Sequence, residues 1–204
     1  MYGVNPFAAQ SSWNAGNGHS STGWGSNTQA PSIFGALPYP SGTTQNALQE
    51  LITFKFTSFN PTILNCKVVG PHNETYFRVV TDASMPGYTI LKNSQGSSIA
   101  LVEWQSHPHV EARGAVTKQP IKSWLKLSTQ RSHRLMVFQG VSYSWTPNDR
   151  FIQLHVSGSA EILVRVSKTY DSVVVEMTPR AIQLGLLEVA ILATVLLQCG
   201  KSID

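Results

Sequence analysis

Residues 181–199 read AIQLGLLEVAILATVLLQC, and this stretch decides the fold. Thr178 is a suitable N-cap, Pro179 suits the first helical position, and Gly200 can end a helix, so we predict one helix over residues 179–199. At 1.5 Å per residue, about 21 residues give a helix about 31 Å long. Its few polar residues leave most of the circumference apolar. Such a helix must be enclosed by protein or by lipid.

The two surroundings are nearly balanced in free energy. Ten Leu, Ile and Val side chains favour membrane insertion by about 3–6 kcal/mol, whereas a central Glu188 opposes it by about 3 kcal/mol and two glutamines add to that cost. A sheet that closes around the helix would also cover it, and the chain offers no second long helix to do so. We therefore expect an enclosed helix, with a membrane anchor as the alternative.

The residues before this helix show the sequence pattern of short β-strands. In residues 51–59, Ile52, Phe54 and Phe56 share one face and polar residues take the other, as in a half-buried strand. Turn residues recur about every eight to twelve positions. About twelve antiparallel strands result. We place them at residues 51–59, 62–69, 74–82, 87–93, 97–105, 108–114, 121–127, 134–139, 141–146, 150–156, 160–167 and 172–176.

The first part of the chain has a different composition. Residues 1–49 contain no charged side chain and are rich in Gly, Ser, Asn and Gln, with aromatic residues spaced between them. Because such a segment buries too little apolar surface to offset its chain entropy, we predict a disordered tail over residues 1–47 and a folded domain over residues 48–200. No basic and apolar leader begins the chain, so we expect a cytoplasmic protein with reduced thiols.

A family resemblance rests on several short motifs. They are Tyr76-Phe77-Arg78-Val79-Val80-Thr81, Tyr88-Thr89-Ile90, Ile99-Ala100-Leu101-Val102-Glu103-Trp104, Trp124-Leu125, Tyr143-Ser144-Trp145 and Leu186-Leu187-Glu188-Val189-Ala190-Ile191-Leu192. Together they resemble a fungal domain family of unknown function, placed in the tubby C-terminal-like superfamily with the LURP-one-related proteins and the phospholipid scramblases. The resemblance spans about residues 48–200. It implies a mainly β, closed antiparallel barrel of about twelve strands around the hydrophobic C-terminal helix. Phosphoinositide binding by tubby domains transfers here only as an analogy.

The most suggestive functional feature is the placement of charge. No acidic residue lies between Glu111 and Asp149, and six basic residues do: Arg113, Lys118, Lys122, Lys126, Arg131 and Arg134. Strand alternation would place Lys122 and Lys126 on one face beside Trp124. These cations could form a patch for phospholipid headgroups, or they could be ordinary solvated surface. Nucleic acid is disfavoured, since Trp124 is the only aromatic residue within residues 112–134.

Other chemistry finds little support. His107 and His109 could face one way in a strand, but a metal site needs further ligands, and the intervening proline favours a surface loop. No nucleophile elbow or phosphate-binding loop occurs, so we expect no enzymatic activity, cofactor or metal. Glu188 would need a barrel mouth or a basic partner, for which Arg78 and Arg165 are candidates.

We therefore predict a non-catalytic, tubby-like binding or adaptor module in the cytoplasm or peripheral to membranes. Its expected partners are anionic phospholipid headgroups, such as those of phosphoinositides, or another protein. The alternative is a tail-anchored or structural interaction protein that uses the helix at residues 179–199.

Overall fold

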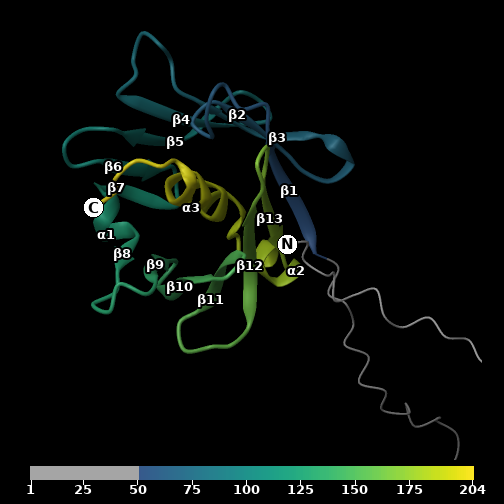
Figure 1. Ribbon diagram of the computed structural model, residues 1–204, viewed down its shortest axis with the longest axis vertical. Helices are drawn as coiled ribbons and strands as arrows, with labels where there is room; N and C mark the ends of the chain where they lie inside the picture. Colours follow the sequence, from purple (N-terminus) through teal and green to yellow (C-terminus); the bar gives the residue numbers. More distant parts are fainter. Residues whose placement is uncertain (1–50) are drawn as a thin grey trace, which may run out of the picture. The chain divides into compact units, whose positions relative to one another are not determined.

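The computed structural model describes residues 51–204, and the tail predicted for residues 1–47 lies outside them. Thirteen strands form one antiparallel sheet (Figure 1). They are β1 Ile52–Thr57, β2 Cys66–Val69, β3 Thr75–Val80, β4 Tyr88–Asn93, β5 Ser98–Glu103, β6 His109–Ala112, β7 Val116–Pro120, β8 Lys126–Leu127, β9 Arg134–Phe138, β10 Val141–Asn148, β11 Phe151–Val156, β12 Ile162–Lys168 and β13 Val173–Met177. The helical segments are η1 Pro71–Asn73, α1 Ile121–Trp124, α2 Pro179–Gln183 and α3 Leu187–Gln198. The mainly β class is thus confirmed.

The sheet consists of two meanders joined at their centre. Strands β1 to β7 pair in chain order, β8 to β13 do the same, and β1 pairs with β13. Alternation explains which side faces the core: in β1, Phe54 and Phe56 are buried while Lys55 is exposed. Phe54 lies opposite Val175 of β13, which is also buried, so the two meanders share one apolar face.

The two outermost strands, β7 and β8, are not hydrogen-bonded to each other. Hydrogen bonds therefore do not close the sheet, and the closed barrel expected from the sequence is not confirmed. The strand expected at residues 121–127 is present only at its end, as β8. Its first half is α1, because Ile121, Trp124 and Leu125 stand at positions i, i+3 and i+4 and are all buried. Alternation does not indicate strand β7, since its centre, Thr117-Lys118-Gln119, is wholly polar.

The apolar C-terminal stretch forms two helices rather than one over residues 179–199. As expected, the Thr178 side chain accepts a hydrogen bond from the backbone N–H of Ala181, and Pro179 opens α2. After α2 the chain turns at Gly185, whose φ of 70° is left-handed, and α3 begins at Leu187. Among residues 51–204, no helix has the length and apolar character that a membrane crossing requires.

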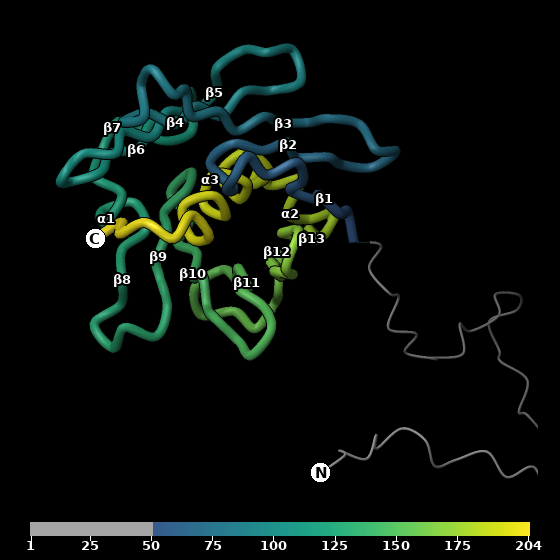
Figure 2. Tube along the Cα trace, turned by 45° about the horizontal axis from the view of Figure 1, so that its top comes forward, coloured from purple at the N-terminus to yellow at the C-terminus, as the bar shows by residue number. Residues whose placement is uncertain are grey.

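The core lies between α3 and the sheet. All side chains from Val189 to Leu196 are buried, including Thr194, whose hydroxyl donates to the Ala190 carbonyl. Figures 1 and 2 show α3 within the curve that the strands form. Glu188 is exposed in the first turn of α3, where the helix dipole favours an acidic residue. Of the two alternatives for Glu188, pairing with Arg78 or Arg165 is not found among the described residues, and Arg165 instead pairs with Glu176 at 3.0 Å.

Candidate functional site

Two of the six basic residues predicted from the sequence are neutralised by ion pairs. Lys118 Nζ on β7 donates to Glu103 Oε1 on β5 at 2.6 Å, and this hydrogen bond raises the pKa of Lys118. Arg134 on β9 pairs with Asp204, with Nη2 and Oδ2 2.6 Å apart. These two charges are therefore already compensated within the protein.

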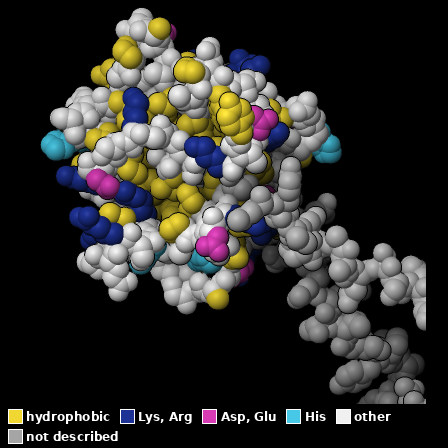
Figure 3. Space-filling view, viewed as in Figure 1, with side chains coloured by type: hydrophobic (Ala, Val, Ile, Leu, Met, Phe, Trp, Pro, Cys, Tyr) yellow, Lys and Arg dark blue, Asp and Glu magenta, His cyan; other side chains and the backbone are white. Residues whose placement is uncertain are grey.

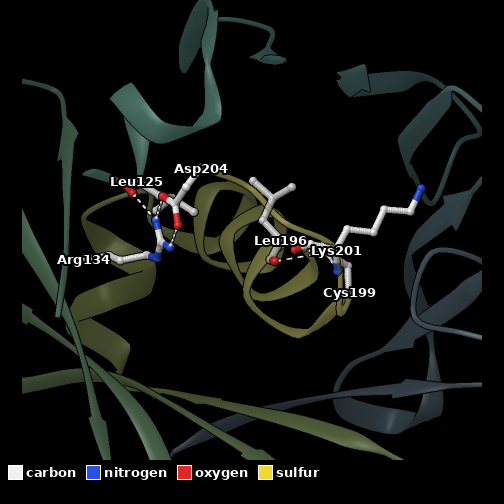
Figure 4. Close-up of polar contacts among 6 residues, drawn as sticks. All are labelled: Leu125, Arg134, Leu196, Cys199, Lys201 and Asp204. Carbon is white, nitrogen blue, oxygen red and sulfur yellow. Dashed lines mark hydrogen bonds and ion pairs between the residues drawn. The ribbon is translucent and has the colours of Figure 1, made fainter. Parts of the chain in front are cut away.

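Arg134 holds two partners from different segments (Figure 4). Its Nη1 donates to the Leu125 carbonyl and to Asp204 Oδ1, each at 2.9 Å, while Nη2 donates to Oδ2. The pKa of Asp204 is lowered, first by the hydrogen bonds from Arg134 and then by the charges of Arg134, Arg131 and Lys122. One of the predicted cations thus binds the Asp204 carboxylate, and the charges of two others act on it. Figure 3 shows Lys and Arg side chains near an acidic one at the left of this face, where Figure 1 places α1 and the C-terminus.

The remaining two predicted cations lie elsewhere. Arg113 lines a hollow of about 260 Å³ together with Glu111. Lys126 lines a different groove, between β7 and β9. Lys122 lies in the helical turn α1 rather than in a strand, so the expectation that Lys122 and Lys126 share a strand face beside Trp124 is wrong. The charge-rich stretch therefore supplies four settings: one at Glu103, one at Asp204, one at Arg113 and one at Lys126.

Three other basic residues lie side by side across the sheet. Lys67 of β2 is the register partner of Arg78 of β3, and Arg78 is the partner of Lys92 of β4. Lys67 and Arg78 are exposed and Lys92 is half-buried, while their neighbours Val68, Phe77 and Leu91 are buried. We call Lys67, Arg78 and Lys92 the cation row. Within residues 51–204, no ion pair involves any of its members.

The sequence indicates that each member of the cation row faces outward, but it does not indicate that the three residues are neighbours. Each member occupies an outward position of a predicted strand, which alternation alone indicates. Their alignment depends on the register between successive strands, and β2 to β3 also has a register shift between Val68 and Val69. Because residue spacing along the chain does not give this register, the row emerges only from the structure.

His109 and Cys66 each contact a nearby backbone carbonyl. Nδ1 of His109 lies 2.8 Å from the His107 carbonyl oxygen, and no group of three metal-ligating side chains occurs in residues 51–204. The Cys66 thiol donates to the Ile63 carbonyl at 3.1 Å. Burial raises the pKa of Cys66 to about 12, so this thiol stays protonated at neutral pH.

The aromatic residues singled out in the sequence belong mainly to the core. Trp124, Trp145 and Tyr143 are buried. Trp104 is half-buried, and its Nε1 donates to Thr89 Oγ1 at 2.7 Å. Tyr76 packs edge-on against Phe54, with ring centroids 5.3 Å apart, and Tyr88 is 38% exposed.

Comparison with known proteins finds one family. Residues 60–198 match the model of DUF6593, which is described as a family of unknown function. An X-ray structure of a protein from Arabidopsis thaliana is similar in fold, with a TM-score of 0.46 and 10% sequence identity. That similarity covers 74% of this chain and 93% of the Arabidopsis chain. No curated protein matches.

Proposed function

The chain belongs to the DUF6593 family of unknown function, and we propose that it is a non-catalytic module that binds anionic phospholipid headgroups through the cation row. The observation that carries this proposal is the register that aligns Lys67, Arg78 and Lys92 across three strands. The cytoplasmic face of a membrane is the proposed place of action. The relation to fungal proteins and to the tubby C-terminal-like superfamily stays a hypothesis, based on the sequence resemblance.

The electrostatics of the cation row favour an external anion. Neighbouring strands are about 4.8 Å apart, and like charges directly opposite each other destabilise a sheet. Because no acidic side chain among residues 51–204 pairs with the row, the repulsion is left for solvent or a ligand to relieve. Each Lys or Arg near an anionic bilayer contributes about 1 kcal/mol, so the row supplies about 3 kcal/mol in total.

Partly apolar side chains continue the same face toward the β3–β4 connection. On β4, Ile90 lies two residues before Lys92, and Tyr88 lies two residues further along the same face. Met85, in the connection itself, is 53% exposed. Tyrosine suits the boundary between lipid and water because its ring is apolar and its hydroxyl is polar. Cations beside such residues fit a bilayer surface better than a site for a free ion.

Vesicle co-sedimentation of the full chain tests the proposal. Vesicles of phosphatidylcholine alone are compared with vesicles that also contain a phosphoinositide, and soluble inositol phosphate serves as a competitor. One variant carries Lys67→Gln, Arg78→Gln and Lys92→Gln. The matched control carries Lys122→Gln, Lys126→Gln and Arg131→Gln, which lowers the formal charge equally at the stretch predicted from the sequence.

We expect the wild type to bind only the phosphoinositide vesicles. The variant of the cation row should bind about a hundredfold more weakly, as the loss of about 3 kcal/mol requires, while the control keeps most of its binding. Competition by soluble inositol phosphate would identify the headgroup rather than the bilayer as the ligand. Absence of wild-type binding, or equal losses in the two variants, would show that the cation row is not the lipid site.

A further inference from the structure

The sheet has an open seam between β7 and β9. Strand β7 pairs only with β6, and β9 pairs with β10 along its length but with β8 only at Arg134 and Leu135. Within residues 51–204, no backbone hydrogen bond joins β7 to β9, so Met136, Val137 and Phe138 are paired on one side only. Both walls of the seam are therefore strand edges with unpaired backbone groups.

Helix α1 explains why the seam stays open. Lys126 of β8 lies opposite Leu135 of β9. A longer β8 in the same antiparallel register would place Trp124 opposite Val137. Trp124 instead belongs to α1, where Ile121 and Trp124 are buried. The residues that could extend β8 along the edge of β9 thus form a helical turn instead.

A groove of about 670 Å³ lies along this seam. Thr117 and Gln119 contribute to one wall, Leu135 and Val137 to the other, and Trp124 and Lys126 also line it. Val137, at 59%, is the most exposed of the large apolar strand residues among residues 51–204. Nε1 of Trp124 is buried without a hydrogen-bond partner among the described residues. Leu135 and Val137 therefore give the groove an apolar centre on the β9 side.

Charge indicates what kind of chain would fit. Lys126 is the charged residue that lines the groove, and no acidic residue occurs in residues 112–148, which supply almost all of its lining. The neighbouring acids Glu103 and Asp204 are already paired with Lys118 and Arg134. An acidic segment is therefore favoured over a neutral or basic one. The uncharged residues 1–49 of this chain lack that complementarity.

We propose that the seam is a docking site for an extended, acidic segment of a partner protein, which adds as a strand to the edge of β9. Main-chain hydrogen bonds to the N–H and C=O of Val137, which face the seam because those of Met136 and Phe138 face β10, would give affinity. Alternate apolar side chains would cover Val137, and an acidic side chain would face Lys126.

Selection from a random library of displayed peptides tests this site on the full chain. We expect the selected peptides to carry a β-branched and an acidic residue two positions apart, because Val137 and Lys126 lie on the same face of the sheet. A synthetic copy of a selected peptide should slow amide exchange at Val137 and its neighbours in β9. Val137→Lys and Lys126→Glu should each weaken its binding at least about tenfold, since one places a charge in the apolar centre and the other reverses the attraction. Ile162→Lys, a matched change at a residue of β12 that is 38% exposed, should leave binding unchanged.

Several results would overturn the proposal. They are a selection that yields no peptide, selected peptides without acidic residues, and binding that Val137→Lys leaves intact. Protection of the β9 edge in the free chain at every concentration would identify a segment of the same chain as the occupant. Protection that rises with protein concentration would identify a second copy. Either of these would also exclude the proposed partner segment.

Discussion

Arg134 binds Asp204 and the Leu125 carbonyl at the same time, and so ties β9 to the end of α1 and to the segment after α3. The Arg134 side chain is only 16% exposed, whereas that of Asp204 is 50% exposed. Ile203, next to Asp204, is buried. This contact holds the C-terminal segment against β9 and the end of α1.

The two partners should contribute unequally to stability. Asp204→Asn should lower the free energy of unfolding by about 1 kcal/mol, a value reduced by solvent screening at the half-exposed carboxylate. Arg134→Gln should cost about 2 kcal/mol, because the Leu125 carbonyl loses its donor as well. Urea unfolding measures both. Lys122→Gln is the control and should change little, and a larger loss from Asp204→Asn than from Arg134→Gln would contradict this ranking.

The Arg134–Asp204 contact should also depend on pH. The folded pKa of Asp204 is lowered, so its contribution is present above the unfolded value of about 3.9 and is lost as pH falls through the folded pKa. The difference in unfolding free energy between the wild type and Asp204→Asn should thus stay constant from about pH 5 to 8 and shrink below about pH 4. Urea titrations across this range test it. A difference that grows on acidification would refute the assigned role of the carboxylate.

The cation row should stabilise less than a neutral row would. Arg78→Gln removes the central charge from between Lys67 and Lys92, so it should raise the free energy of unfolding by about 0.5 kcal/mol at low salt. At about 1 M salt the gain should vanish, because the Debye length falls to about 3 Å. Lys168→Gln is the control, since Lys168 lies opposite Val173. A gain that survives high salt would mean that repulsion is not its cause.

The sequence predicts the strands better than their connections. Alternation locates β3 within residues 74–82 and β4 within residues 87–93, because each has a buried face and an exposed face. It fails at β7, where only Val116 is buried, and at α1, where four residues are too few to show a helical period. Closure of the sheet depends on β7 and α1. The alternation of apolar and polar residues therefore cannot predict whether the sheet closes.

The candidate site shows the same limit. Lys118 and Lys122 are near neighbours in the sequence, yet one pairs with Glu103 and the other lies near Asp204. In contrast, Lys67 and Lys92 are far apart in the sequence and flank the same residue, Arg78. Charged residues that are close in the sequence are separated in space when a turn lies between them. Charged residues on different strands become neighbours when the strands pair in the right register. Only the structure supplies that register.

The two cysteines should differ in reactivity. Cys66 is 6% exposed, and burial raises its pKa to about 12. Cys199 is half-buried, and its pKa is raised less strongly, again mainly by burial. Iodoacetamide at pH 8 should therefore modify Cys199 first and Cys66 only after unfolding, as peptide mass mapping would show. Urea-unfolded chain is the control, in which both should react alike. Equal rates in the folded chain would contradict the burial of Cys66.

The break between α2 and α3 depends on Gly185. Its φ of 70° costs a residue with a side chain about 1–2 kcal/mol, although an added Cβ would meet only Gln139 Nε2, at 4.0 Å. Gly185→Ala should thus lower the free energy of unfolding by about 1 kcal/mol, and Gly185→Asn by less, because Asn tolerates left-handed backbone. Gly87→Ala is the matched control, since Gly87 has no positive φ and open space around it. Chemical denaturation measures all three. If Gly185→Ala were as stable as the wild type, the chain would tolerate a continuous helix, and the turn would not depend on glycine.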